Sequence, residues 1–303
     1  MSQTKAQLIN PLGELSSSDV TVNSVSIGKG ANSVAGNTVL GENALDASVS
    51  GGDNTAIGKD ALTTLTSGTN NVAVGSQSLD ANTTGSKNTA IGHQSLSANT
   101  TGTDNSAVGA FTLLVNTTGS NNIAFGQGSL EANTTGGSNT ALGLAALKTN
   151  TTASDNTAVG RSALTLNTTG TFLTAVGSQS LDANTTGTRN TAIGYQSASA
   201  ITTGGSNVAV GSFALLATTT ADNNVSIGHT SMEANTTGAS NTAVGQGALG
   251  ANTTASNNVG VGRSALGANT TGASNVAVGG STLDENTTAS NNTAVGQAAM
   301  GAN

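Results

Sequence analysis

The feature that most constrains this chain is a 17-residue period. A pattern close to Asn-(Thr/Val)-Ala-(Val/Ile)-Gly starts at Asn54, Asn71, Asn88, Asn105, Asn122, Asn139, Asn156, Asn190, Asn207, Asn224, Asn241, Asn258, Asn275 and Asn292. Leu173 keeps the register without the Asn, an earlier copy at Asn37 fits it, and a degenerate copy at Ser24 precedes Asn37 by 13 residues. We therefore expect about sixteen copies of one structural unit over residues 23–303, in register from residue 37.

Comparison of the copies shows what each place in the unit tolerates. With the Asn as place 1, place 4 is a large apolar residue, place 3 is almost always Ala, and place 9 is Leu or Met in all but one copy. Places 4 and 9 are the predicted structural core, and they include Ile57, Leu62, Val74, Leu79, Ile91 and Leu96. Place 5 is always Gly, as expected at a corner where φ is positive or another backbone passes close by. These structural corner residues include Gly58, Gly75, Gly92, Gly109, Gly126, Gly143, Gly160 and Gly177.

Short β-branched stretches, corner glycines and Asn-rich turns in so short a unit predict an all-β chain, a parallel β-solenoid (β-roll) in which each unit is one rung. Sixteen rungs stacked about 4.8 Å apart would extend roughly 75 Å. Each rung offers only two large apolar side chains, worth roughly 1.5 to 3 kcal/mol each when buried, against an ordering cost of about 1 to 2 kcal/mol per residue. We therefore expect the small Ala face to pack against sister chains in a homotrimer; a narrow monomeric solenoid is the alternative.

The remaining places predict the outer surface. Places 6, 7, 10, 16 and 17 vary freely and carry most of the charges, so we expect them to face solvent and to carry any recognition of a partner. Places 12 to 15 read Asn-Thr-Thr-(Gly/Ala) in most copies, which predicts a second turn. Stacking would arrange the Asn side chains in a ladder and the Thr hydroxyls in columns. A flat Thr array raises ice or crystal-surface binding as an alternative function.

Composition excludes several classes of protein. With only 8 Lys and Arg and a formal charge of −7, the chain has no basic patch to hold nucleic acid. No run approaches the roughly 18 to 20 apolar residues of a membrane helix, so we expect no membrane insertion. Residues 1–11 lack the apolar core of a secretory signal, so we expect no Sec export. The absence of Cys excludes disulfides and thiolate metal sites.

No arrangement of residues predicts chemistry. His93 and His229 both occupy place 6, but eight rungs separate them and no third ligand recurs beside them. Asp53, Asp104 and Asp155 recur at place 17 without the Gly-Asp nonapeptide pattern of calcium-binding rolls, which favours solvated turns. A nucleophile needs a positioned base, and nothing here supplies one. We expect no enzyme activity and no catalytic, cofactor-binding or metal-binding residues.

The motif Asn-Thr-Ala-Val-Gly-x-x-x-Leu-x-x-Asn-Thr-Thr, as it runs from Asn241, resembles repeats of tail-fibre-like proteins of bacteriophages, notably those infecting marine cyanobacteria. The opening MSQTKAQLINPLGEL is also similar to the start of such proteins. More loosely, the Ser-Val-Ser-Ile-Gly copy at Ser24 resembles heads of trimeric autotransporter adhesins, which implies a left-handed parallel β-roll. The resemblance implies a virion fibre shaft, made in the host cytoplasm, that spaces or presents a surface for contact with a host glycan or protein. A bacterial surface adhesin is the alternative.

Residues 1–22 lie outside the repeat and contain Leu8, Pro11 and Leu15. We expect this segment to attach the shaft to other virion proteins or to cap it, because a solenoid end exposes unpaired backbone that needs a cover. A flexible leader is the alternative interpretation.

Overall fold

The computed structural model describes residues 19–301, in two compact units that divide after residue 121. The first unit contains β1 (Val20–Val22), β2 (Val25–Gly28), the 3-10 helix η1 (Ala31–Ser33), β3 (Thr38–Gly41), β4 (Thr55–Ile57), β5 (Val72–Val74), β6 (Thr89–Ile91) and β7 (Ser106–Val108). The second contains β8 (Ile123–Phe125), β9 (Thr140–Leu142), β10 (Thr157–Val159), β11 (Thr174–Val176), β12 (Thr191–Ile193), β13 (Val208–Val210), β14 (Val225–Ile227), β15 (Thr242–Val244), β16 (Val259–Val261), β17 (Val276–Val278) and β18 (Thr293–Val295).

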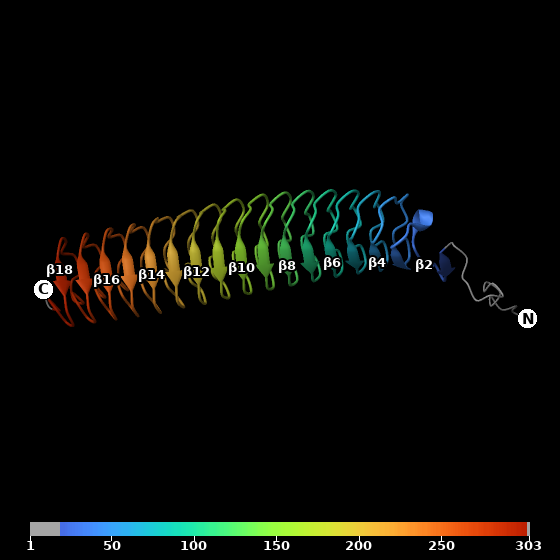
Figure 1. Ribbon diagram of the computed structural model, residues 1–303. Coiled ribbons are helices and arrows are strands. Elements are labelled where there is room, and N and C mark those ends of the chain that lie inside the picture. The colour runs from blue at the N-terminus through green and yellow to red at the C-terminus, as the bar shows by residue number, and fades with distance from the viewer. Residues whose placement is uncertain (1–18, 302–303) are drawn as a thin grey trace, which may run out of the picture. The chain divides into compact units, whose positions relative to one another are not determined.

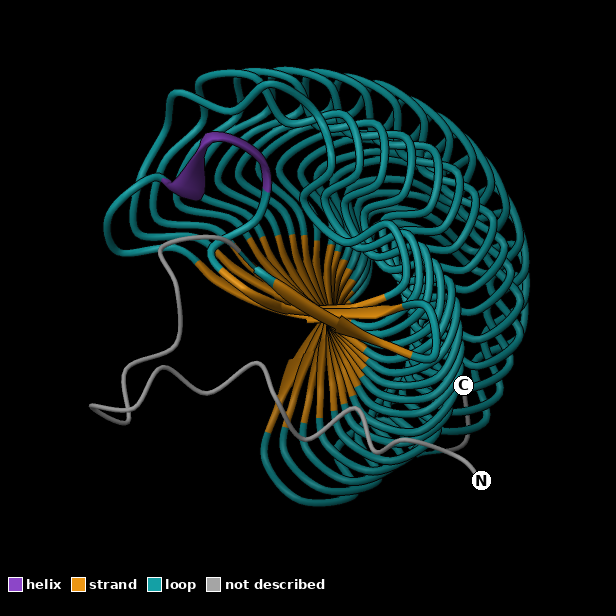
Figure 2. Ribbon diagram, turned by 90° about the vertical axis from the view of Figure 1, so that its right-hand side faces the viewer, coloured by secondary structure: helices purple, strands orange, loops and turns teal. Residues whose placement is uncertain are grey.

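Each unit is a parallel β-solenoid with one strand per 17-residue rung. Within each unit every strand from β3 onward pairs in parallel with the next, and equivalent places lie opposite each other, as in Thr157↔Thr174 and Ala158↔Ala175. The strands follow one another as parallel arrows in Figure 1, and the rest of each rung is loop and turn (Figure 2). The predicted all-β fold, a parallel β-solenoid with a 17-residue rung, is confirmed.

The N-terminal copy differs from a rung. β1 and β2 form an antiparallel hairpin, and its two-residue turn at Asn23 and Ser24 has positive φ at both residues, as a type I′ turn requires. β2 also pairs antiparallel with β3. The spacing of 13 residues from Ser24 to Asn37 is too short for a full rung, and the chain reverses instead.

The hairpin covers the backbone edge of β3, which would otherwise be open to pairing. The Asp19 carboxylate accepts the backbone N–H groups of Lys29 and Gly30, each at 2.7 Å, and so ties down the start of the hairpin. Of the expected attachment or capping segment, residues 1–18 lie outside the described residues. β1 and Asp19 belong to the edge-covering hairpin.

The interior of each rung is filled by small side chains and one Leu. Place 3 Ala residues such as Ala73 and Ala158 are fully buried, as are the place 9 residues Leu62, Leu79 and Leu96. Because side chains alternate along a strand, places 2 and 4 point outward. Ile57 and Val74 are only half-buried and Ile91 is 39% exposed, which corrects the expectation that place 4 belongs to the core. On the strand side, the narrow coil has room only for the methyl group of Ala. The Leu side chain from the opposite side of the rung fills the rest of the apolar interior.

The eight predicted corner glycines, listed above, all have φ between 120° and 137°. This region is essentially restricted to Gly. A Cβ added at Gly75 would lie 2.5 Å from the carbonyl oxygen of Gly92, the corner of the next rung. Both reasons given for Gly at a corner therefore apply at once.

Two ladders of buried Asn side chains run up the rungs. At place 1, the backbone N–H and the Nδ2 of Asn71 both donate to Oδ1 of Asn54, at 3.0 Å each. At place 12, Nδ2 of Asn99 donates to Oδ1 of Asn82 at 2.8 Å. The two ladders meet at place 15, where Asn71 and Asn82 both donate to the Gly85 carbonyl oxygen, at 2.9 Å each. Because the Asn groups are hydrogen-bonded from rung to rung, each rung can bury two polar side chains beside its Ala and Leu.

Where another residue replaces Asn in a ladder, hydrogen bonds between rungs are lost. Leu173 still donates its backbone N–H to Asn156 Oδ1 at 3.0 Å but offers no side-chain oxygen to Asn190. At place 12, Ile201 follows Asn184, and the buried Oδ1 of Asn184 has no hydrogen-bond partner among the described residues. A hydrophobic side chain therefore fills the space of an Asn without replacing its hydrogen bonds.

Candidate functional site

Within each unit, the outer face of the sheet is the first surface that no other part of residues 19–301 covers. It consists of places 2 and 4, which carry no charged residue in any rung from Asn54 onward. Its exposed large apolar side chains are Ile91, Ile123, Phe125, Ile193, Ile227, Val278 and Val295. We call this surface the sheet face. The alanines predicted to meet sister chains lie instead inside their own coil, which corrects that expectation, because place 3 points inward.

The second surface comes from a longer repeat that the 17-residue comparison does not reveal. The ten residues Ser76–Gly85 recur unchanged at Ser178–Gly187, 102 residues later. In the rung that follows each copy, an aromatic residue occupies place 6 and Gln occupies place 7; one rung further, place 7 is Phe. We name this set the Asp-Gln-aromatic cluster. Its first copy comprises Gln77, Asp80, His93, Gln94 and Phe111, and its second Gln179, Asp182, Tyr195, Gln196 and Phe213.

The rings of both copies pack alike. The His93 and Phe111 ring centroids lie 5.3 Å apart at an interplanar angle of 88°, and those of Tyr195 and Phe213 lie 5.4 Å apart at 82°. In the second copy His229 extends the row, with its ring 6.0 Å from that of Phe213. These edge-to-face contacts hold the rings in place at the surface, where His93, Tyr195 and His229 are exposed and both Phe rings are half-buried.

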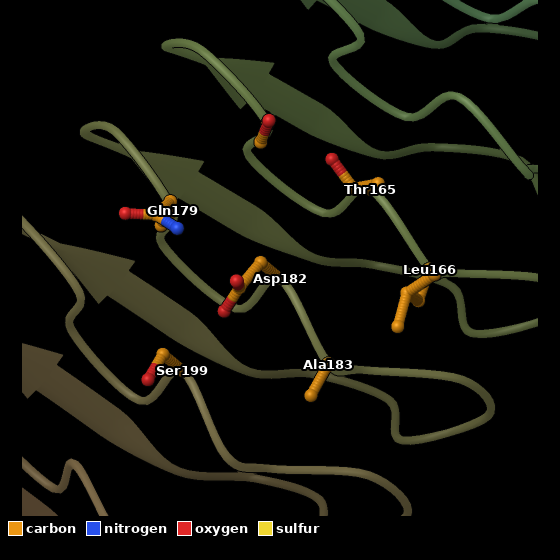
Figure 3. Close-up of a pocket in the computed structure, with 7 residues that line it drawn as sticks. Thr165, Leu166, Gln179, Asp182, Ala183 and Ser199 are labelled. Carbon is orange, nitrogen blue, oxygen red and sulfur yellow. The ribbon is translucent and has the colours of Figure 1, made fainter.

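The polar part of the cluster is also duplicated. Gln94 Nε2 donates to Gln77 Oε1 at 3.0 Å, and Gln196 Nε2 to Gln179 Oε1 at 3.5 Å. In the second copy a surface hollow of about 380 Å³ opens beside Gln179 and Asp182. It is lined by Ser162, Thr165, Leu166, Gln179, Asp182, Ala183 and Ser199. Figure 3 shows Asp182 between Thr165 of the preceding rung and Ser199 of the following one.

The carboxyl groups of both copies have raised pKa values. Burial raises the pKa of Asp182 above its ordinary value of 3.8, against the backbone N–H groups of Asp182 and Ala183, which lower it. Burial also raises the pKa of Asp80, with a small contribution from Asp60 and an opposing hydrogen bond from Ser97. Both carboxylates are thus poorly solvated, and a ligand that donates hydrogen bonds would favour their charged form.

Replacement of Asp182 by Asn is expected to stabilise the fold slightly at neutral pH. Because the folded pKa is raised, the folded state binds the proton more tightly, so the stability of the wild type falls as pH rises from the ordinary value of 3.8 through the folded pKa. The gain should stay below about 1 kcal/mol because the group is only half-buried. Urea unfolding at about pH 3 and pH 7 measures it; the exposed Asp155→Asn is the control. A variant less stable than the wild type at neutral pH would contradict this account.

The His and Asp residues that recur at places 6 and 17 have structural surroundings. His93 and His229 each contact a Phe ring, and in residues 19–301 no group of three or more His, Cys, Asp or Glu side chains could hold a metal ion. Asp53, Asp104 and Asp155 are all exposed, with φ between 57° and 61°. They occupy a left-handed turn, in keeping with the solvated-turn interpretation.

The Thr columns also have a structural use. The place 13 hydroxyls donate across rungs, as Thr83 Oγ1 does to the Thr100 carbonyl oxygen at 3.1 Å and Thr168 Oγ1 to that of Thr185 at 3.0 Å. Their protons are therefore engaged within the coil. Place 14 Thr residues such as Thr84 and Thr101 are exposed.

The described part of the chain has no helix long and apolar enough to cross a membrane. No protein-family model, curated protein or solved structure matches this chain.

Proposed function

We propose that this protein is a non-enzymatic structural shaft of a virion, a phage tail or capsid fibre that assembles as a homotrimer and presents a contact surface to the host. The observation that carries the structural role is the stack of similar 17-residue rungs within each unit, in which the buried side chains form hydrogen-bond ladders and pack the interior. The resemblance of the repeat to phage tail-fibre-like proteins supports the virion setting.

The sheet face supports self-association. Ile193 and Ile227 are 40% and 38% accessible, and a large apolar side chain occupies place 4 in every rung from Asn54 onward, half-buried in most rungs and exposed in the others. A contiguous uncharged apolar strip is a recognised mark of an interface. A partner that follows this strip must match a repeat of about 4.8 Å over many rungs, and a second and third copy of the same chain do so without further adjustment.

In this arrangement the three sheet faces meet at a common axis, and places 6, 7 and 10 remain outside. The Ala face contributes nothing to the assembly, because it is already inside each coil. Residues 1–22 would attach the shaft to other virion proteins. An ice-binding role has less support, since the place 13 hydroxyls are engaged in hydrogen bonds within the coil.

The double variant Ile193→Glu/Ile227→Glu is expected to convert the trimer into monomers. Each substitution places a carboxylate where three chains converge, and burying an unpaired charge costs several kcal/mol. Light scattering on the purified protein measures the mass, which for the wild type should be three times that of the chain. The matched control, Ser206→Asp/Ser240→Asp, adds the same charge to the same rungs at exposed place 17 and should leave the mass unchanged.

A monomeric wild type would overturn the trimer, and circular dichroism on the variants separates dissociation from unfolding. The virion role is tested separately, by detection of the protein in purified particles and its location by electron microscopy. Absence from purified particles would remove that role, whatever the oligomeric state.

A further inference from the structure

We infer that the Asp-Gln-aromatic cluster is a binding site for neutral saccharides, present twice in each chain. This inference rests on the proposed function in one respect: it gives the contact surface of the shaft its residues and its class of ligand.

The first argument is the position of the aromatic side chains. The chain has only 4 Phe, 1 Tyr and 2 His, and no Trp. None of them lies in the core, and five of these seven rings stand at places 6 and 7, just after the corner Gly: four in the two clusters, and His229 beside the second. A solenoid that needs no aromatic residue for folding holds exposed rings in fixed edge-to-face geometry at this one corner. Such rigid exposed rings are typical anchors of binding surfaces.

The second argument is the chemistry of the hollow that adjoins the second copy of the cluster. Its lining combines a carboxylate, an amide and hydroxyls with the apolar side chain of Leu166, and it contains no Lys or Arg. Its volume of about 380 Å³ lies within the range of small-ligand sites. The half-buried Asp182 accepts hydrogen bonds, while Gln179 and Ser199 can donate or accept them. This set suits a ligand rich in hydroxyl groups and disfavours an anion.

The third argument is continuity between the hollow and the rings. Gln179, Gln196 and Phe213 occupy place 7 in three successive rungs, and the amides of the two Gln are in contact at 3.5 Å. Rungs about 4.8 Å apart put Phe213 roughly 10 Å from Gln179, about the length of two linked sugar rings. One sugar can pack its C–H face against the rings while the hydroxyls of the next reach Asp182.

The fourth argument is recurrence. Other positions at places 6, 7 and 10 change from rung to rung, yet the Asp, both Gln and the ring pair return together 102 residues later. Asp80 and Asp182 also share a pKa raised by burial. Packing does not demand this combination, because rungs without it, such as that of Asn258, have the same strand and the same buried Leu.

The test is an array of neutral and acidic oligosaccharides probed with the intact protein, followed by calorimetry with the neutral oligosaccharide that binds best. We expect two sites per chain. Phe111→Ala/Phe213→Ala should weaken binding at least tenfold, as should Asp80→Asn/Asp182→Asn, and Phe213→Ala alone should halve the number of sites. The matched control is Phe172→Ala, which removes a ring that is 56% exposed at place 17, outside both clusters.

Failure to bind any neutral oligosaccharide would overturn the inference, as would equal loss in the Phe172 variant or no loss in the cluster variants. Light scattering on the same samples keeps the two proposals apart. A trimer that binds no saccharide would contradict the saccharide site but agree with the trimeric shaft. A monomer that binds saccharide at both clusters would agree with the site but contradict the trimeric shaft.

Discussion

Gly160→Ala is expected to cost more than about 3 kcal/mol and to unfold the rungs around it. Gly160 has φ of 137°, a conformation that costs about 1 to 3 kcal/mol for other residues. The added Cβ would lie 2.5 Å from the Gly177 carbonyl oxygen and 2.6 Å from its carbonyl carbon. Both are backbone atoms held by the ladder, so neither can rotate away. Urea unfolding combined with hydrogen exchange measures the loss and locates it, because repeat arrays can unfold in parts.

The same substitution at Gly247 provides the control. Gly247 occupies place 7 with φ of 63°, and a Cβ there would have its nearest contact at 3.9 Å, with Ser264 Oγ. Ala145 adopts a similar φ of 57° at the same place of another rung. Gly247→Ala should therefore cost only about 1 kcal/mol, the ordinary penalty for left-handed backbone. Equal destabilisation by the two variants would show that positive φ, and not contact between rungs, makes the corner Gly necessary.

The sequence alone predicts the fold because each rung shows again which residue types its places require. Comparison of copies reveals the period, the corner Gly and the twelfth-place Asn ladder. It also misplaces the core, because the size of Val and Ile at place 4 suggests an interior position, whereas the interior at the strand accommodates only Ala. The real constraint is the width of the coil, which depends on how Leu62 and its equivalents cross it, and no single place in the repeat reports that width.

Backbone conformation at place 9 could not have been predicted either. Leu62, Leu79 and Leu96 all have φ between 52° and 53°, although Leu rarely adopts the left-handed region. Hydrogen bonds to the next rung hold the backbone in this conformation. The Leu79 N–H, for example, donates to the Ser95 carbonyl oxygen at 3.0 Å. Tertiary pairing therefore overrides local preference in every rung.

The Asp-Gln-aromatic cluster could not be predicted by comparing the rungs place by place, for a related reason. Averaging over rungs makes places 6, 7 and 10 look variable, since Asp182 and Tyr195 each represent a minority choice. Their combination becomes visible only when segments 102 residues apart are compared. The residues of the Asp-Gln-aromatic cluster differ from the architectural ones in their spacing, because the architecture repeats in every rung whereas the cluster occurs twice, six rungs apart.

Asn139→Ala is expected to cost about 3 to 5 kcal/mol, although it removes only a few atoms. Asn139 Nδ2 donates to Asn122 Oδ1 at 3.1 Å and to the Ala153 carbonyl oxygen at 2.9 Å, and Asn139 Oδ1 accepts the Asn156 N–H at 3.1 Å. All these groups are buried. The two hydrogen bonds that Asn139 Nδ2 donates are lost at about 1 kcal/mol each, and the Asn156 N–H is left without its acceptor, which adds about 1 to 3 kcal/mol. Hydrogen exchange should show the opening centred on β9 and β10.

Thr140→Ala, at the next residue, is the matched control. Its backbone pairing is the same, but its side chain points outward on the sheet face, so the cost should stay within about 1 kcal/mol. A further variant, Asn139→Leu, reproduces the natural break at Leu173 and isolates the hydrogen bonds from the cavity. It should remain less stable than the wild type, because Leu fills the space but offers no oxygen to the next rung. If Asn139→Leu were as stable as the wild type, apolar packing rather than the Asn ladder would hold the rungs together.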